Sequence, residues 1–285
     1  MIIQKKNSII MKVGIYRTIE NFTKYLESLA IFLNSIDVEV IDLEYNKFDD
    51  TCDIIVMFGP IFFKKYKKLN PEQTTLLLFD PAIGSLATSC SINHNGLFNN
   101  SGWFNNPNIT SSRWDEKNYK VDPWRKEGEE ILLLLEPPAH LTYGKKENYN
   151  YDLIVEELLD LNFKVKIRNH PFNVNKRVNK YIKHINPYKE SLDKSLENCI
   201  ATVGFSSKAL VSSVLSGIPV VCLAEESYVK TISMNTLKDL SSVQYFDRYS
   251  WCNSLAYCVW DIEEILSGCF WEAYIKIILN NKNNK

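Results

Sequence analysis

The chain has 285 residues, 45% of them hydrophobic and 24% charged, with a formal net charge of -1. These values are typical of a folded globular protein and exclude a disordered or fibrous chain. Because the net charge is close to zero, there is no overall attraction to nucleic acids or anionic membranes, and a polyanion has to be bound by a local basic patch.

Seven cysteines are scattered along the chain without a CxxC pair. An odd number of isolated cysteines is typical of reduced thiols in a cytosol, and we interpret them as structural, with no zinc site. The stretch MIIQKKNSIIMKVGIY has no long apolar segment, and no window approaches the roughly 20 apolar residues of a membrane span. We therefore expect a cytoplasmic protein. A strand-like run begins at Met11, so the natural start is either Met1 or Met11.

The first part of the chain alternates between strand-like and helix-like segments. Apolar runs at 11–16 and 38–43 flank an amphipathic helical pattern at 19–36, which predicts a βαβ unit. Further runs at 53–60 and 74–81 each end at a proline, as parallel strands buried on both faces do. Between about 84 and 128 the pattern gives way to Gly, Asn, Ser and aromatic residues. A stretch of this length indicates functional loops and a domain crossing.

A second alternating series begins at EEILLLLEPP, residues 129–138. It continues as a helix at 150–162, a strand at 163–168, a helix at 189–198, a strand at 199–204, a helix at 206–217 and a strand at 218–224. Such alternation predicts a second parallel sheet. The aromatic-rich stretch 251–279 predicts two helices with a break near Gly268.

These two series predict an α/β protein with two Rossmann-like domains, an N-terminal domain at 11–118 and a C-terminal domain at 119–250. Helices at 251–280 are expected to pack across the domain junction. Open α/β folds bind ligands outside the carboxyl ends of their strands, so we expect the functional residues at a central cleft between the two sheets.

His170 follows the strand 163–168 directly, and Pro171 fixes the turn that presents it. Ser206 and Ser207 follow the next strand and stand where they cap the helix that comes after. A capped helix start with hydroxyl groups is a ready site for a phosphate. The alternative at each position is structural: a histidine that ends a strand, and an ordinary helix cap. The two motifs at neighbouring strand ends together favour phosphate binding.

Two segments carry a family resemblance: IRNHP, and VGFSSKALVSSVLSGIPVV after it. They resemble the donor half of GT-B glycosyltransferases, especially capsule and sialic or Kdo-type sugar transferases. The segments at 94–136 and 247–271 also look like parts of uncharacterised glycosyltransferase-like proteins from surface-polysaccharide loci and phages. The resemblance covers roughly residues 90–271 and implies a GT-B fold, two Rossmann-like domains facing a central cleft.

The resemblance also implies that His170 and the hydroxyls of Ser206 and Ser207 hold the phosphate of a nucleotide-sugar donor. Arg168 and Lys208 fit the same task, unless they are an ordinary strand residue and an exposed helix residue. The sequence has no G-x-G-x-x-G loop, no Walker A motif and no DxD-like pair on a loop after a strand. We therefore expect transfer without a metal or cofactor, with a CMP-, UDP- or GDP-linked sugar as co-substrate.

Two residues of the N-terminal domain are candidates for the base that deprotonates an acceptor hydroxyl. His94 is expected on a loop that leaves the carboxyl edge of the first sheet, and a histidine near its ordinary pKa acts as a base at neutral pH. Asp80, at the end of the run 74–81, is the rival. For both, the alternative is a residue that only caps a turn or faces solvent.

The remaining candidates are residues that could contact the acceptor, the ribose or the sugar. An aromatic platform for a sugar or base, or a plug that orders a long loop, is formed by Trp103, Phe104, Arg113 and Trp114. Glu225 and Glu226 follow the last strand of the second series and either bind ribose or sugar hydroxyls or form a solvated pair.

Three functions stay open. The first is transfer of a sugar to a hydroxyl of a surface glycan or, for a phage protein, of a hydroxymethylated base in DNA. Four lysines at 62–70 either steer such a polyanion or form a solvated helix face. The second is a sugar-nucleotide epimerase or hydrolase of the same architecture, and the third is an inactive scaffold that binds a nucleotide or a partner. The oligomeric state is left open.

Overall fold

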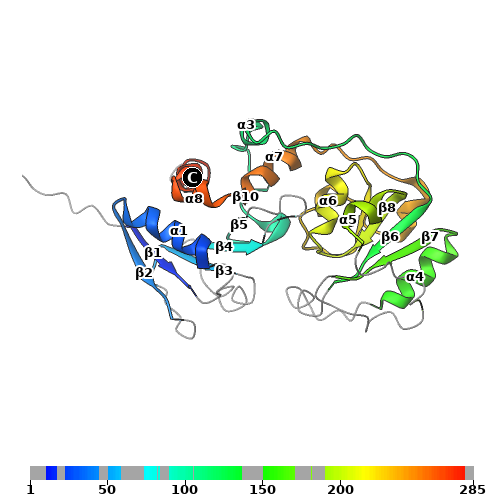
Figure 1. Cartoon of the computed structure of the whole chain (residues 1–285), viewed down its shortest axis with the longest axis horizontal. Helices are drawn as coiled ribbons and strands as arrows, with labels where there is room; N and C mark the ends of the chain where they lie inside the picture. The colour runs from blue at the N-terminus through cyan, green and yellow to red at the C-terminus, as the bar shows by residue number, and fades with distance from the viewer. Residues whose placement is uncertain are drawn as a thin grey trace, which may run out of the picture.

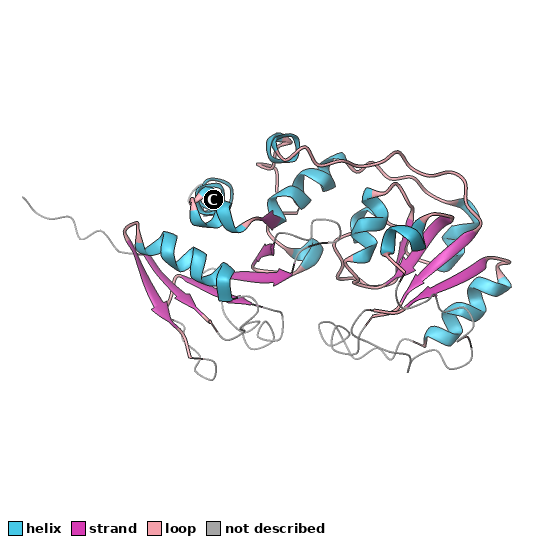
Figure 2. Cartoon of the chain, in the orientation of Figure 1, coloured by secondary structure: helices cyan, strands magenta, loops and turns pink. Residues whose placement is uncertain are grey.

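The computed structural model describes residues 11–17, 23–44, 51–58, 74–81, 83, 90–104, 106–136, 150–170, 181 and 190–279. In these residues the strands form two separate sheets, one six-stranded and one four-stranded (Figure 1, Figure 2). The mixed α/β fold class predicted from the sequence is therefore confirmed, and a single continuous sheet is excluded. The lysine segment 62–70 lies outside the described residues, as does Pro171.

The first sheet has the strand order β10-β5-β4-β3-β1-β2. Its strands are β1 (Met11–Ile15), β2 (Val38–Asp42), β3 (Ile54–Phe58), β4 (Thr75–Pro81), β5 (Cys90–His94) and β10 (Val259–Trp260). The strands β1 to β4 are parallel to one another. All five residues of β3 are buried, as expected for a central parallel strand. Helix α1 (Thr23–Asn34) buries one face against this sheet.

The second sheet has the order β7-β6-β8-β9 and is parallel throughout. Its elements are β6 (Glu130–Leu134), α4 (Tyr151–Asp160), β7 (Lys164–Arg168), α5 (Leu192–Leu196), β8 (Cys199–Gly204), α6 (Ala209–Leu215) and β9 (Val220–Cys222). Alternate residues of β6 enter different cores, because successive side chains of a strand point to opposite faces. Leu132 belongs to the core that contains α6, and Leu133 to the core that contains α4.

Strand β5 corrects the expectation of an irregular loop after residue 84. It runs antiparallel to β4, and its residues Cys90 and His94 pair with Pro81 and Leu77. His94 therefore lies towards the start of β4, away from the carboxyl edge at which we had expected it. The sequence pattern did not predict this strand, because Ser91 and Asn93 are polar. In the structure both residues are completely buried.

The C-terminal segment returns to the first sheet. After α7 (Tyr249–Cys258), strand β10 adds to the edge of β5, and α8 (Ile262–Leu266) packs against α1. Helix α9 (Cys269–Tyr274) follows Gly268, whose positive φ of 85° lies at the predicted break. The prediction of one helix before this break was wrong, because the segment is divided into α7, β10 and α8 where β10 pairs with β5. The last element among the described residues is a π-helical turn, Ile275–Leu279.

Two segments connect the sheets: one leads from α3 (Ser112–Glu116) to β6, and the other leads back to α7. The guanidinium of Arg248 joins them, because it donates to the carbonyls of Asp122 and Val214 and stacks 3.8 Å over the ring of Trp124. Short 3-10 helices complete the described elements: η2 (Phe98–Asn100), η5 (Lys230–Ile232) and η6 (Leu237–Ser242). The domain boundaries at 118 and 250 stay a prediction.

Candidate functional site

The carboxyl edge of the second sheet collects polar residues from four strands. Leu134 of β6 pairs with Arg168 of β7, and Leu133 pairs with Val203 of β8, which places Gly204 beside Leu134. Two residues after these positions, a polar residue follows each of the three strands: Glu136 after β6, His170 after β7 and Ser206 after β8. Glu225 follows β9 at the same edge. Because all four strands are parallel, the sheet brings these residues to one edge, as the sequence pattern predicted for three of them.

The first sheet contributes Asp80 to the same junction. Asp80 is the penultimate residue of β4, and its carboxylate forms an ion pair with Lys208 Nζ at 2.8 Å. The side chains are 15% and 21% exposed, respectively, and Lys208 Nζ also donates to the carbonyl of Pro81. A candidate base and a candidate phosphate-binding cation, proposed from different domains, therefore touch each other. We call Asp80 and Lys208 the junction pair.

Ser206, Ser207 and Lys208 form a turn, and helix α6 begins only at Ala209. The predicted serine cap is thus displaced: Lys208 occupies the cap position without a side-chain cap, and Ser207 Oγ accepts the Ala209 N–H at 3.3 Å. Ser206 turns the other way and directs both its N–H and its hydroxyl to the carboxylate of Glu136. The Ser206 N–H and hydroxyl are therefore not available to a phosphate as the chain stands.

Glu136 was not among the residues selected from the sequence. Its side chain lies beneath the turn and is almost completely buried, with the Tyr151 hydroxyl accepting its backbone N–H at 3.2 Å. Burial raises the pKa of the Glu136 carboxyl, and the hydrogen bonds from Ser206 and neighbouring amides only partly oppose this. A polar residue directly after an apolar strand was the signal that identified His170, and the same signal would have identified Glu136.

Arg168 is bound to α5 and the residues just before it. Its Nη1 donates to the carbonyls of Glu190 and Ser191 and to the Ser195 hydroxyl, at 2.8 to 3.3 Å. Burial lowers the pKa of Arg168, and the charges of Glu190 and Asp193 oppose this. These contacts connect β7 to α5, so the structural alternative fits Arg168 better. His170 is half-buried at the strand end.

The loop after β9 contacts the first half of the chain. The Ser227 N–H donates to Asn99 Oδ1 at 3.2 Å, and the Tyr228 hydroxyl exchanges hydrogen bonds with the Asn93 amide. Tyr228 is buried against Phe98, with ring centroids 5.2 Å apart. The loop thus holds Glu225 and Glu226 beside the junction. The Glu225 side chain is largely exposed and pairs with Lys230 at 3.2 Å.

The proposed aromatic platform is a plug. Trp103 is completely buried, donates its indole N–H to the Ile92 carbonyl at 2.8 Å and stacks on Tyr257. Arg113 is buried as well, between Glu264 and the face of Trp260. Neither residue presents a face to an acceptor, so the second of the two sequence interpretations fits them. Phe104 is buried too, and Trp114 is half-buried against Tyr119.

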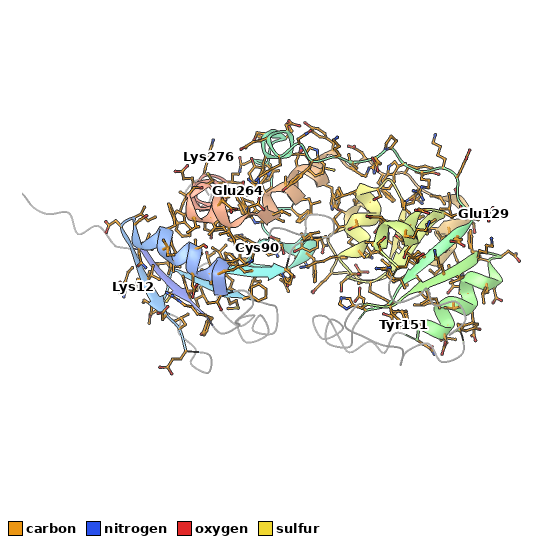
Figure 3. The ribbon with its side chains drawn as sticks, in the orientation of Figure 1. Lys12, Cys90, Glu129, Tyr151, Glu264 and Lys276 are labelled. Atoms are coloured by element: carbon orange, nitrogen blue, oxygen red, sulfur yellow. The ribbon has the colours of Figure 1, made fainter. Side chains whose placement is uncertain are left out.

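The Arg113 cluster is a network of charges that fixes the C-terminal segment. Arg113 donates to both carboxylate oxygens of Glu264, at 2.7 and 2.9 Å, and Lys117 pairs with Glu264 at 2.9 Å. Glu264 is labelled in Figure 3. Burial raises the pKa of Glu264, but the hydrogen bonds and charges of Arg113 and Lys117 and the Asp261 N–H outweigh it and lower the pKa to about 2. This cluster joins α3 to α8 and has no candidate ligand role.

His94 is 8% exposed, and its ring lies 5.8 Å from that of Tyr274. A Cβ added to Gly102 would come within 2.2 Å of His94 Nδ1, so the chain passes close over the imidazole. An acceptor hydroxyl has no direct approach to the ring in this arrangement. Asp80 is therefore the better placed of the two candidate bases.

In the described part of the chain, no three or more His, Cys, Asp and Glu side chains are grouped so that they could hold a metal ion. None of the described helices has the length and apolar character needed to cross a membrane.

Comparison with known proteins identifies solved structures with a similar fold. No protein-family model matches the sequence, and a search of curated proteins finds no significant match. The fold is similar to that of the beta Kdo 2,7 transferase KpsC of Thermosulfurimonas dismutans, with a TM-score of 0.60 and 12% identity over 92% of this chain and 99% of that one. For the beta Kdo 2,4 transferase KpsC of that organism the TM-score is 0.53, with 13% identity over 87% of this chain and 90% of that one.

The chain therefore has the GT-B-like fold of these transferases. At 12 and 13% identity the similarity concerns the fold and not the substrate.

Proposed function

We propose that this chain is a glycosyltransferase that moves a sugar from a nucleotide donor to an acceptor hydroxyl. The observation that carries the proposal is the junction pair, in which Asp80 of the first sheet meets Lys208 of the second at 2.8 Å. The contact brings the candidate base and the candidate phosphate-binding cation into one place, and this supports a group transfer between two substrates bound side by side. The similarity in fold to Kdo transferases supports the same reaction class.

In the proposed reaction the acceptor oxygen attacks the anomeric carbon of the donor sugar. The bond from that carbon to the phosphate oxygen breaks, and the nucleotide leaves with the bonding electrons. Asp80 takes the proton of the acceptor hydroxyl. The phosphate draws Lys208 away from Asp80, and Lys208, Ser207 and His170 stabilise the charge that develops on the leaving group.

The reaction as proposed needs no metal, with the leaving group stabilised by side chains alone. Nucleotide release should therefore continue in the presence of EDTA. Glu225 and Glu226 are proposed to bind hydroxyls of the ribose or the sugar. They follow β9, which neighbours β8, the strand that Ser206 follows.

The test is nucleotide release from CMP-, UDP- and GDP-linked sugars, measured with and without acceptor. Release that depends on the acceptor supports a transferase. Release without acceptor indicates the epimerase or hydrolase alternative, and binding without release indicates an inactive scaffold. For the acceptor, surface glycans and DNA with hydroxymethylated bases should be compared at several salt concentrations, because binding to a DNA polyanion weakens steeply with salt.

A further inference from the structure

Glu136 contacts neither substrate in the proposed reaction, yet its carboxylate is buried at the edge that forms the candidate site. One carboxylate oxygen accepts the Ser206 N–H, and the other accepts the Ser206 hydroxyl at 3.1 Å. The backbone N–H groups of Phe205 and Ser207 lie close enough to oppose the rise of its pKa. A carboxylate that is 1% exposed is costly to bury without such donors. The turn 205–208 is therefore folded around this carboxylate.

The other side of Glu136 is held equally firmly. The backbone N–H of Glu136 donates to the hydroxyl of Tyr151, which projects from the start of α4 (Figure 3). The Tyr151 ring packs edge-to-face on Phe205, with centroids 5.7 Å apart. Tyr151 thus touches both the residue that provides the carboxylate and the turn that receives it. Tyr151 therefore supports both the backbone from which the carboxylate extends and the start of the turn.

We propose that Glu136 is a positioning residue for the donor phosphate: it holds the turn 205–208 so that Ser207 and Lys208 face the junction. The inference rests on the proposed function, because it assigns the ligand of this turn. The inference follows from the different contacts that Ser206 and Lys208 make within the turn. Ser206 directs its polar groups inwards to Glu136, whereas Lys208 reaches across to Asp80 on the other sheet.

The variants Glu136→Leu and Glu136→Gln test the proposal, with binding of CMP, UDP and GDP measured by calorimetry. Leucine has a similar size but accepts no hydrogen bond, so the nucleotide that the wild type binds should bind at least tenfold more weakly. Glutamine keeps one oxygen for the Ser206 N–H and should bind within about threefold of the wild type. The matched control is Glu130→Leu on the same strand, where Glu130 only pairs with Lys166 at 3.9 Å; it should leave binding within about twofold.

Ser206→Ala carries the test if Glu136→Leu does not fold. It removes one donor to the carboxylate and should weaken nucleotide binding about threefold and speed amide exchange in the turn, while Ser216→Ala at the far end of α6 changes neither. A purely structural role would lower thermal stability without changing nucleotide affinity.

Two results would overturn the inference: wild-type affinity in both Glu136→Leu and Ser206→Ala, or tenfold tighter binding in Glu136→Gln, which would mean that the carboxylate competes with the phosphate. A wild type that binds none of the three nucleotides would instead refute the proposed function, and the inference with it. Failure of the inference and failure of the proposed function can be distinguished. Only if the proposed function fails do the wild type and the Glu130→Leu control bind no nucleotide.

Discussion

Among the ion pairs that join distant parts of the described chain, Arg113–Glu264 and the junction pair differ in what else their members bind. Arg113 and Glu264 are 7% and 15% exposed, and Arg113 also donates to the carbonyls of Ala256 and Val259. Trp260 covers the guanidinium at 3.5 Å. In the junction pair, Lys208 has a flexible side chain with a single charge and binds Asp80 and one carbonyl. The first pair is held by further contacts inside the protein, whereas Lys208 of the second has the mobile point charge that our proposal assigns to the phosphate.

The largest expected effect comes from removing the carboxylate of the junction pair. Asp80→Asn keeps the size of the side chain but cannot take a proton, so sugar transfer should slow by roughly 10² to 10⁴. The measurement is kcat with saturating donor and acceptor. His94→Gln is the comparison and should retain transfer within about threefold. A dead His94 variant beside an active Asp80 variant would return the role of the base to the histidine.

Arg113→Met should reduce the free energy of unfolding by about 3 kcal/mol, because it leaves Glu264 buried with Lys117 as its remaining ion-pair partner. Urea unfolding at pH 7 measures this loss. The exposed pair of Lys194 and Glu197 provides the control, since Lys194→Met should cost less than about 0.5 kcal/mol. Transfer per folded molecule should stay at the wild-type level. A variant that is stable but inactive would contradict the purely structural role of the cluster.

Glu264 should make the wild type sensitive to acid. Its pKa falls from the ordinary 4.5 to about 2 in the folded state, so its contribution to stability is complete above pH 4.5 and is lost as the pH falls towards 2. After allowance for the partial exposure of the carboxylate, this contribution is roughly 2 kcal/mol. Unfolding curves of the wild type and Glu264→Gln should therefore converge between pH 4.5 and 2. Parallel pH curves would argue against the pairing.

The smallest effect concerns donor affinity at the junction pair. Lys208→Met should weaken nucleotide binding about tenfold, as expected for the loss of one charge-assisted contact. Asp80→Asn should tighten it about threefold, because Lys208 then has no competing carboxylate. Lys194→Met on α5 serves as the control and should bind as the wild type does. Shifts in the same direction for the two junction variants would show that Asp80 and the phosphate do not compete for Lys208.

Local patterns in the sequence were sufficient for most of the sheet structure. Apolar runs such as β3 and β6 are buried on both faces, and that burial is visible in composition alone. Strand β5 was missed because Asn93 and Ser91 make its pattern polar. These residues are buried because Asn93 bonds to Tyr228 and Ser91 lies near the carbonyls of Asp80 and Pro81. A polar side chain with a distant partner cannot be distinguished from a loop residue in the sequence.

The sequence by itself determined which residues end the strands, and therefore that Asp80, His170, Ser206 and Lys208 lie at carboxyl edges. Only the tertiary structure decided which of them meet. Glu136 and Ser206 are 70 residues apart in the chain, and the contact between Lys208 and Asp80 joins two sheets. The physical reason is that strand formation depends on the periodicity of neighbouring residues, whereas the direction of a polar side chain depends on the nearest donor or acceptor in space.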